Sequence, residues 1–153
     1  MLRMASPQLG RYRPQDKDGF AELVIDVHTE FGFGYDPVLD VDLSDPEAHY
    51  RHILLIKVDD AVVGSAALTV PHGGSTTLKR MYLRAELRGQ GWGRRLLAAA
   101  TDLATQDGCE RIELDTNDRQ PDACRLYERA GFTLLRKRGT TRYYVKDLTT
   151  PTP

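Results

Sequence analysis

The sequence has no long hydrophobic run, and its apolar stretches span only a few residues, as at 53–56. A helix that crosses a membrane needs about 20 consecutive apolar residues, so we expect no membrane association. The first residues, 1–7, also lack the apolar segment of a secretory signal peptide. We therefore expect a cytoplasmic protein.

Cysteine is scarce, and there is no excess of positive charge. We interpret the two cysteines, Cys109 and Cys124, as small buried apolar residues in a reducing compartment. The four histidines show no metal-ligand spacing with them, so we expect no metal. Lys plus Arg is 21 against 22 for Asp plus Glu, and this net charge of -1 argues against nucleic-acid binding.

The chain of 153 residues is 41% hydrophobic, which suits one domain with a sizeable core. We expect that domain over residues 1–148, with a disordered tail at 149–153. Charge is uneven along it: residues 16–60 hold twelve acids and three bases, and residues 79–95 hold six bases and one acid. The two segments are either two different ligand surfaces or solvated faces that balance each other.

Hydrophobic periodicity predicts a mixed α/β domain without repeats. Phe20, Leu23, Val24 and Val27 have the spacing of a buried helical stripe. We expect Gly108 and Gly131 to end two later helices and Gly139 to lie in a final hairpin. The predicted helices are 16–29, a short one after Asp45, 93–107 and 121–130; the predicted strands are 9–13, 53–58, 62–70, 76–83, 111–115, 132–138 and 141–146.

The most informative segment lies between the predicted strand at 76–83 and the helix at 93–107. Its glycines allow a tight turn that exposes successive N–H groups at a helix start, where phosphate oxygens bind well. Arginines there oppose the helix dipole, and a bound anion would remove that conflict. The alternative is a capping loop with arginines in solvent. The segment reads Arg88-Gly89-Gln90-Gly91-Trp92-Gly93-Arg94-Arg95.

This pattern, R-x-x-G-x-G, fits neither the dinucleotide fingerprint nor the P-loop. It resembles the signature of the GNAT superfamily of acyl-CoA-dependent N-acyltransferases. Residues 78–84 resemble the central strand of that family, and residues 123–132 resemble its A-x-x-L-Y-x-x-x-G-F block. The resemblance covers about residues 9–148. It implies a mixed, mostly antiparallel sheet of about seven strands, splayed at a V-shaped cleft, with about four helices.

The resemblance also implies how acetyl-CoA binds. Main-chain groups of residues 81–83 would pair with the pantetheine arm, and amides of residues 88–94 would hold the pyrophosphate. The strand at 111–115 would form the other wall. Where the family often has Asn, this chain has Gln120. The implied contacts are Met81, Tyr82, Leu83, Arg88, Gly89, Gln90, Gly91, Trp92, Gly93, Arg94, Gln120 and Tyr127.

Tyr127 is the candidate general acid. It belongs to a helical stripe with Ala123, Leu126 and Ala130, so its ring should face the core. A phenol with a pKa near ~10 is protonated at neutral pH and can give its proton to the departing CoA thiolate. The alternative is a packing tyrosine whose hydroxyl finds any acceptor.

The base is not given by the resemblance, because the central strand carries Lys79 and Arg80 where many members have Glu. Asp115 is the first candidate and Glu30 the second, either as base or as substrate contact. His72 is the third. Each of these is also explained as a surface or capping residue, and a water chain open to bulk solvent would serve as well.

We expect the acceptor site between the first helix, an aromatic loop and the final hairpin. Aromatic side chains there can stack on a flat or cationic group, or can instead fill the core. Nearby acids would attract a cationic amine. The aromatic candidates are Phe31, Phe33, Tyr35 and Tyr143, and the acids are Asp26, Glu30, Asp36, Asp40 and Asp42.

These features predict an N-acetyltransferase that moves the acetyl group of acetyl-CoA to a primary amine of a small molecule by direct attack in a ternary complex. A homodimer is the default assembly. One alternative is acetylation of a protein amine. Another is a non-catalytic acyl-CoA-binding regulatory module, which the missing central-strand Glu and Gln120 favour. Nucleic-acid binding through residues 79–95 is disfavoured by the net charge.

Overall fold

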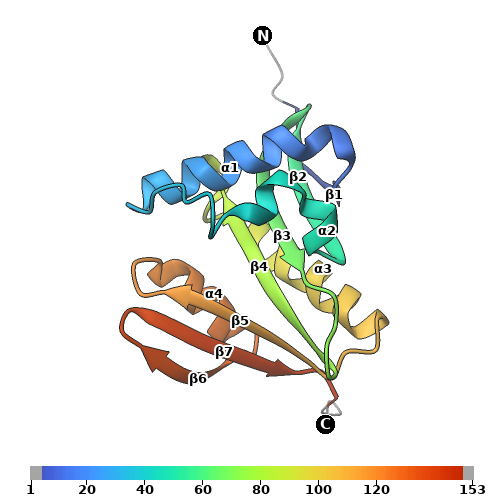
Figure 1. The fold of residues 1–153 in the computed structure, drawn as a ribbon, viewed down its shortest axis with the longest axis vertical. Coiled ribbons are helices and arrows are strands. Elements are labelled where there is room, and N and C mark those ends of the chain that lie inside the picture. Colours follow the sequence, from blue (N-terminus) through green and yellow to red (C-terminus); the bar gives the residue numbers. More distant parts are fainter. Residues whose placement is uncertain (1–4, 150–153) are drawn as a thin grey trace.

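The computed structural model describes residues 5–149, which form one seven-stranded sheet in the order β1-β2-β3-β4-β5-β7-β6 (Figure 1). The strands are β1 (Gln8–Arg11), β2 (His52–Val58), β3 (Ala61–Leu68), β4 (Ser75–Leu83), β5 (Arg111–Asn117), β6 (Thr133–Arg138) and β7 (Thr141–Asp147). The helices are α1 (Lys17–Glu30), α2 (Pro46–His49), α3 (Trp92–Gln106) and α4 (Pro121–Arg129), with 3-10 turns η1 (Pro14–Asp16), η2 (Val41–Ser44) and η3 (Ala85–Leu87). The predicted fold class is confirmed, with element ends shifted by one or two residues.

Some expectations concern the chain as a whole. Cys109 and Cys124 are buried and free, as predicted. Among residues 5–149 there is no group of His, Cys, Asp or Glu arranged to hold a metal ion. No helix of that range has the length and apolarity needed to cross a membrane. The predicted disordered tail lies outside the described residues except for Thr149, whose N–H donates to Asp147 Oδ1 at 2.8 Å.

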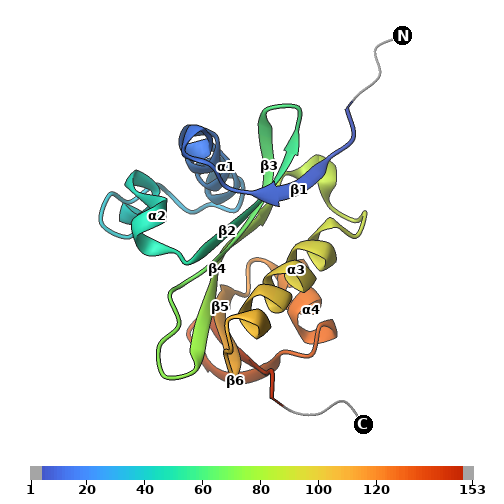
Figure 2. The same cartoon turned by 90° about the vertical axis from the view of Figure 1, so that its right-hand side faces the viewer.

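Helices cover both faces of the sheet. Figure 2 shows α1 and α2 on one face and α3 and α4 on the other. Beneath α1, the predicted stripe of Phe20, Leu23, Val24 and Val27 is buried against β2 and β3. Beneath α3, a second apolar cluster reaches from β2 across to β5 and β7. The second cluster therefore joins the two halves of the sheet.

The sheet is split between β4 and β5. These strands pair in parallel only where residues 75–77 meet residues 111–113, and they diverge beyond Thr77 (Figure 1). A bulge adds to the divergence: the pairing of β3 with β4 shifts after Ser65, and Arg80 has a positive φ of 55°. Bulges bend and twist a strand away from its neighbour. The hydroxyl of Ser65 donates to the Arg80 carbonyl at 2.6 Å and holds the bulge in place.

Candidate active site

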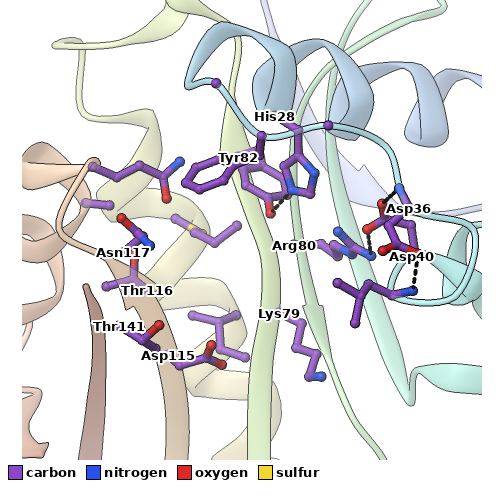
Figure 3. A pocket seen from close by; sticks show the side chains of 18 of the residues that line it. His28, Asp36, Asp40, Lys79, Arg80, Tyr82, Asp115, Thr116, Asn117 and Thr141 are labelled. Carbon is purple, nitrogen blue, oxygen red and sulfur yellow. Dashed lines mark hydrogen bonds and ion pairs between the residues drawn. The ribbon is translucent and has the colours of Figure 1, made fainter. Parts of the chain in front are cut away.

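A cavity of about 700 Å³ occupies the split between β4 and β5 (Figure 3). Its walls come from both halves of the sheet and from the loop that follows α1. They are formed by His28, residues 32–36, Leu39 and Asp40 on one side, residues 78–82 of β4 below, and residues 115–117, Gln120, Ala123, Tyr127 and Thr141 on the other side. An extended ligand can therefore lie along β4 and meet groups from α1 and α4.

The edge of β4 offers main-chain groups to this cavity, because no strand pairs with it on the β5 side beyond Thr77 in the described chain. Met81 packs toward the cluster under α3, and Tyr82 packs toward the cluster under α1. Leu83 does not line the cavity, and its carbonyl accepts hydrogen bonds from the Arg88 side chain at 2.8 and 3.1 Å. The free edge therefore ends at Tyr82 rather than at the predicted Leu83, and it begins at Leu78 rather than at the predicted Met81.

The glycine-rich loop ends in a helix start with free donors. Gly89 and Gly91 have φ of 75° and 87°, which other residues adopt only with strain. Within residues 5–149, the main-chain N–H groups of residues 89–94 have no protein acceptor, whereas the N–H of Arg88 donates to Ala85 O at 3.2 Å. An array of free N–H groups at a helix N-terminus suits a phosphate. The main-chain N–H of Arg88, which the sequence predicted as a donor to the pyrophosphate, is therefore not free.

The arginine side chains of this loop differ from the expectation. Arg88 folds back and forms a bidentate ion pair with Glu30, and Arg95 lies over the Trp92 ring at 4.1 Å. In the described part of the chain, Arg94 alone of the three has neither an ion pair nor a ring contact. The ion pair with Glu30 therefore partly offsets the charge of Arg88 at this helix start.

Tyr127 of α4 is 4% exposed, and its ring contacts Phe132 and Tyr144 with centroid distances of 5.9 and 6.2 Å. Tyr127 lines the cavity, and its hydroxyl has no hydrogen-bond partner among the described residues. Burial, helped by nearby Tyr82, raises the pKa of Tyr127 well above its usual range. The phenol is therefore protonated at neutral pH and available as a donor.

Gln120 lies at the start of α4, where its N–H donates to Asn117 O at 2.9 Å. Gln120 and Asn117 both line the cavity. The Asn117 amide is held by Thr140 at 2.9 Å, and its side-chain oxygen accepts from the Arg119 N–H. The Gln120 amide has no such partner in the described chain, so it is the freer of the two toward a ligand.

The structure separates the three candidate bases. Asp115 is exposed, lines the cavity, and has no ion pair within the described chain. Glu30 does not line the cavity, and the hydrogen bond from Arg88 holds its pKa below the usual value. His72 exchanges main-chain hydrogen bonds with Ser75 in the turn before β4, away from the cavity. Of these three candidates, Asp115 alone lines the cavity.

Two of the four aromatic residues predicted for the acceptor site line the cavity, and the other two do not. Phe33 and Tyr35 line the cavity. Phe31 instead lies beneath the Arg88 guanidinium at 5.2 Å, and Tyr143 lies beneath Arg136 at 4.4 Å. The final hairpin reaches the cavity through Thr141 rather than through a tyrosine.

Four of the five predicted acids pair with arginines of the basic segment, whereas Asp36 lines the cavity and has no ion pair among residues 5–149. Asp26 pairs with Arg84 at 2.8 Å, and Glu30 pairs with Arg88. Deeper in the fold, one guanidinium bridges two carboxylates: Arg80 Nη2 lies 2.6 Å from Asp42 and 3.0 Å from Asp40.

The charge of Asp42 is stabilised inside the protein. Burial alone would raise its pKa, but hydrogen bonds from Arg80 and Tyr50 outweigh burial and hold the pKa below its usual value. The Arg80 guanidinium remains charged in turn, and its pKa is raised by Asp42 against the effect of burial. These carboxylates are therefore committed to the fold and are not free to bind an amine.

Sequence reasoning missed one pair in the cavity. His28 Nε2 lies 2.7 Å from the Tyr82 hydroxyl, and both residues line the cavity (Figure 3). A signal was present, because His28 continues the i, i+4 spacing of Phe20 and Val24 on the buried side of α1. A histidine at the end of an apolar stripe faces the same interior as the stripe.

Comparison with known proteins agrees with this geometry. Residues 20–132 match the family model described as Acetyltransferase (GNAT) family. "Uncharacterized N-acetyltransferase YjgM" of Escherichia coli (strain K12) is 30% identical over 138 residues, which cover 83% of this chain and 82% of that protein. "Aminoalkylphosphonate N-acetyltransferase" of Salmonella typhimurium is 35% identical over 96 residues, or 60% of each chain.

Solved structures share the fold. A GNAT-family acetyltransferase from Staphylococcus aureus Mu50 superposes with a TM-score of 0.85 at 21% identity, over 94% of this chain and 100% of that one. The PaiA N-acetyltransferase of Thermoplasma acidophilum, solved in complex with coenzyme A, has a TM-score of 0.74 at 16% identity, over 93% and 99% of the two chains.

The family match and the N-acetyltransferase relatives define the class of this protein as an acyltransferase. The chain belongs to the GNAT family of N-acetyltransferases. The alternative of a non-catalytic module is therefore not supported.

Proposed function

We propose that the protein transfers the acetyl group of acetyl-CoA to the primary amine of a small molecule, by direct attack on the thioester in a ternary complex. The observation that carries this proposal is the row of unpartnered main-chain groups along the split. It begins on the free edge of β4 and continues in the N–H groups of residues 89–94. A ligand with an amide-containing arm and a diphosphate matches both parts.

The residues along the cavity and in the glycine-rich loop suit acetyl-CoA as the acyl donor. The pantetheine arm would pair with the edge of β4 as an added strand, and the diphosphate would accept from the free N–H groups of the loop. Arg94 is the exposed cation at the same helix start without a protein partner in the described chain. Gln120 would reach the arm from the opposite wall, in the position implied for it by the resemblance.

The transfer needs a group that stabilises the leaving sulfur. As the amine nitrogen bonds to the acyl carbon and the C–S bond breaks, negative charge develops on sulfur. The Tyr127 hydroxyl would be that donor, since a phenol is protonated at neutral pH and burial raises its pKa further. Among the described residues that line the cavity there is no cysteine to carry an acyl group, which favours one direct step.

We propose that the acceptor is a small amine that also carries an acidic group. Lys79 and Asp115 are exposed in the cavity and have no ion pair among residues 5–149. Lys79 would pair with the acidic group and Asp115 with the ammonium. The name of the Salmonella relative points to the same chemistry, since an aminoalkylphosphonate is an amine with an acidic group.

The test is release of CoA thiol from acetyl-CoA in the presence of an amine panel. We expect turnover with amino acids or aminoalkylphosphonates to exceed turnover with polyamines by at least tenfold. Intersecting double-reciprocal plots are expected for a ternary complex, and parallel plots would contradict direct attack. Turnover on peptides alone would favour a protein acceptor. Absence of turnover with every amine of the panel would overturn the proposal.

A further inference from the structure

The strongest feature outside the expected machinery is the hydrogen-bonded pair of His28 and Tyr82. His28 stands in the last turn of α1, and Tyr82 comes from β4, the strand that the thioester would follow. Their rings meet edge to face with centroids 5.3 Å apart, and the Nε2–Oη distance is 2.7 Å. Figure 3 shows both side chains, joined by a dashed line, in the wall of the cavity. The pair therefore joins the acceptor side of the site to the donor strand.

The surroundings fix the imidazole in this position. Phe33, from the loop after α1, lies against the His28 ring at 6.1 Å. The partly buried Tyr82 ring packs against the apolar cluster under α1, and this packing orients its hydroxyl. Rings held on several sides keep one geometry, which a proton path requires.

The charges that face His28 come from three elements. Arg80 lies on β4 with Tyr82, Asp40 lies in the loop that follows α1, and Asp42 lies in η2. Burial is the largest influence and lowers the His28 pKa, Arg80 lowers it further, and the two carboxylates partly oppose this. The net result is an imidazole that is neutral at pH 7. In its Nδ1–H tautomer, such an imidazole accepts at Nε2 from the Tyr82 hydroxyl.

We propose that Tyr82 and His28 together take the proton that the attacking amine loses as it bonds to the acyl carbon. An N–H bond of the nitrogen breaks and an O–H bond forms at Tyr82 Oη. The original Tyr82 proton passes to His28 Nε2, which becomes imidazolium and later loses its proton to solvent. No electrons leave or enter the system.

The timing of the transfer follows from acidity. A free ammonium has a pKa of about 10, far above that of imidazole, so imidazole would remove its proton only at a large cost. The ammonium therefore loses one proton to solvent before attack, because only the neutral amine has an electron pair for the acyl carbon. Once that nitrogen bonds to the acyl carbon it is much more acidic, and the transfer of its next proton to Tyr82 becomes favourable. Tyr82 is the group that touches the nitrogen, and His28 acts through Tyr82. This inference rests on the proposed function.

The test compares H28Q and Y82F with the wild type in kcat and KM over pH 5–9. In the wild type, we expect kcat to rise through one ionisation below pH 7 and then to level. In H28Q and Y82F, we expect kcat to fall by about 10²-fold and that ionisation to disappear. The KM for acetyl-CoA should change less than twofold. H52Q is the matched control: His52 also has a side-chain partner, Asp107 at 2.7 Å, and does not line the cavity.

Two results would overturn the inference. One is an H28Q enzyme that keeps the same ionisation in kcat, which would leave His28 with a structural role at most. The other comes from ¹⁵N NMR without any substrate: a His28 ring protonated at pH 7, or an Nε2–H tautomer. If the wild type acetylates no amine, the proposed function fails; if it does but H28Q keeps its pH profile, only this inference fails.

Discussion

Tyr127 is a buried phenol with a hydroxyl that no protein group satisfies in the described chain, beside a cavity. We predict that Y127F lowers kcat by about 10²-fold, because the developing thiolate loses its donor. The KM for acetyl-CoA should stay within twofold, since the ring and its packing remain. Steady-state kinetics with a fixed amine will check this.

Tyr144 offers the matched control for Tyr127. It is equally buried, its ring lies next to Tyr127, and its hydroxyl donates to Glu128 at 2.7 Å instead of facing the cavity. Y144F should leave kcat unchanged and lower the free energy of unfolding by about 1 kcal/mol. Equal kcat values for Y127F and the wild type would remove Tyr127 from the mechanism.

Arg80 carries the charge that keeps two buried carboxylates paired. We predict that R80M lowers the free energy of unfolding by about 3–5 kcal/mol at pH 7, because Asp40 and Asp42 lose their counter-charge in a buried place. The loss should shrink at acid pH, where protonated carboxyl groups need no cation. Urea denaturation at pH 7 and pH 4 will measure both. The neighbouring K79M should change stability by less than about 0.5 kcal/mol, since Lys79 is exposed.

The turn that leads into α3 depends on glycine at Gly91, where φ is 87°. We predict that G91A weakens CoA binding by about tenfold, because a Cβ favours negative φ and turns the free N–H groups away from the diphosphate. The same change should lower stability by about 1–2 kcal/mol. Isothermal titration with CoA will measure the affinity.

A substitution at Gly139 is the control for G91A. It has a φ of 60° in the turn between β6 and β7, with no atom within 4 Å of an added Cβ. G139A should lower stability by a similar amount and leave the affinity for CoA unchanged. If both variants bind CoA like the wild type, the loop amides do not hold the diphosphate.

How far the sequence predicts these elements depends on the range of the forces involved. The stripe of α1 and the glycines that end α3 and α4 are local features, and the structure has positive φ at Gly108 and Gly131. The ion pairs are not local: Glu30 and Arg88 are 58 residues apart. Charge counts revealed an acidic and a basic segment and left open whether the two balance each other, but they did not show which residues pair across the fold.

The candidate site divides in the same way. The sequence placed Tyr127 and the glycine loop, because each has a motif with a local geometry. It gave Phe31 and Tyr143 a place in the acceptor site, whereas both lie under arginines elsewhere. Which face of a loop an aromatic ring takes is decided by partners far along the chain, and no spacing rule reports them.

The stability of the whole molecule should depend on pH in two steps. Folding lowers the pKa of His28 below the 6.5 of an ordinary histidine, so the unfolded chain binds a proton first as pH falls. Stability is therefore full above about pH 6.5 and begins to decline below it. The pKa values of Asp42 and Asp107 also lie below the ordinary 3.8, so their contribution is kept above that pH and is lost as pH falls further.

Urea unfolding from pH 8 to pH 3 will resolve these steps. In H28Q, the decline between pH 6.5 and pH 5 should be absent, while the decline near pH 4 remains. A wild-type curve that is flat from pH 8 to pH 5 would show that His28 gains or loses no proton affinity on folding. The measurement needs no substrate, so it is independent of any question about catalysis.

Arg88 stands in the motif that marks the coenzyme loop, yet its side chain ties the last residue of α1 to the end of β4 through Glu30 and Leu83. The helix that it steadies carries His28 and continues into the loop with Phe33, so its guanidinium supports the wall that we propose for the amine. Removing that guanidinium would therefore raise the Michaelis constant of the amine while the affinity for the nucleotide stays near normal. If so, a residue of the motif that is typical of the coenzyme loop would act mainly on the proposed amine site.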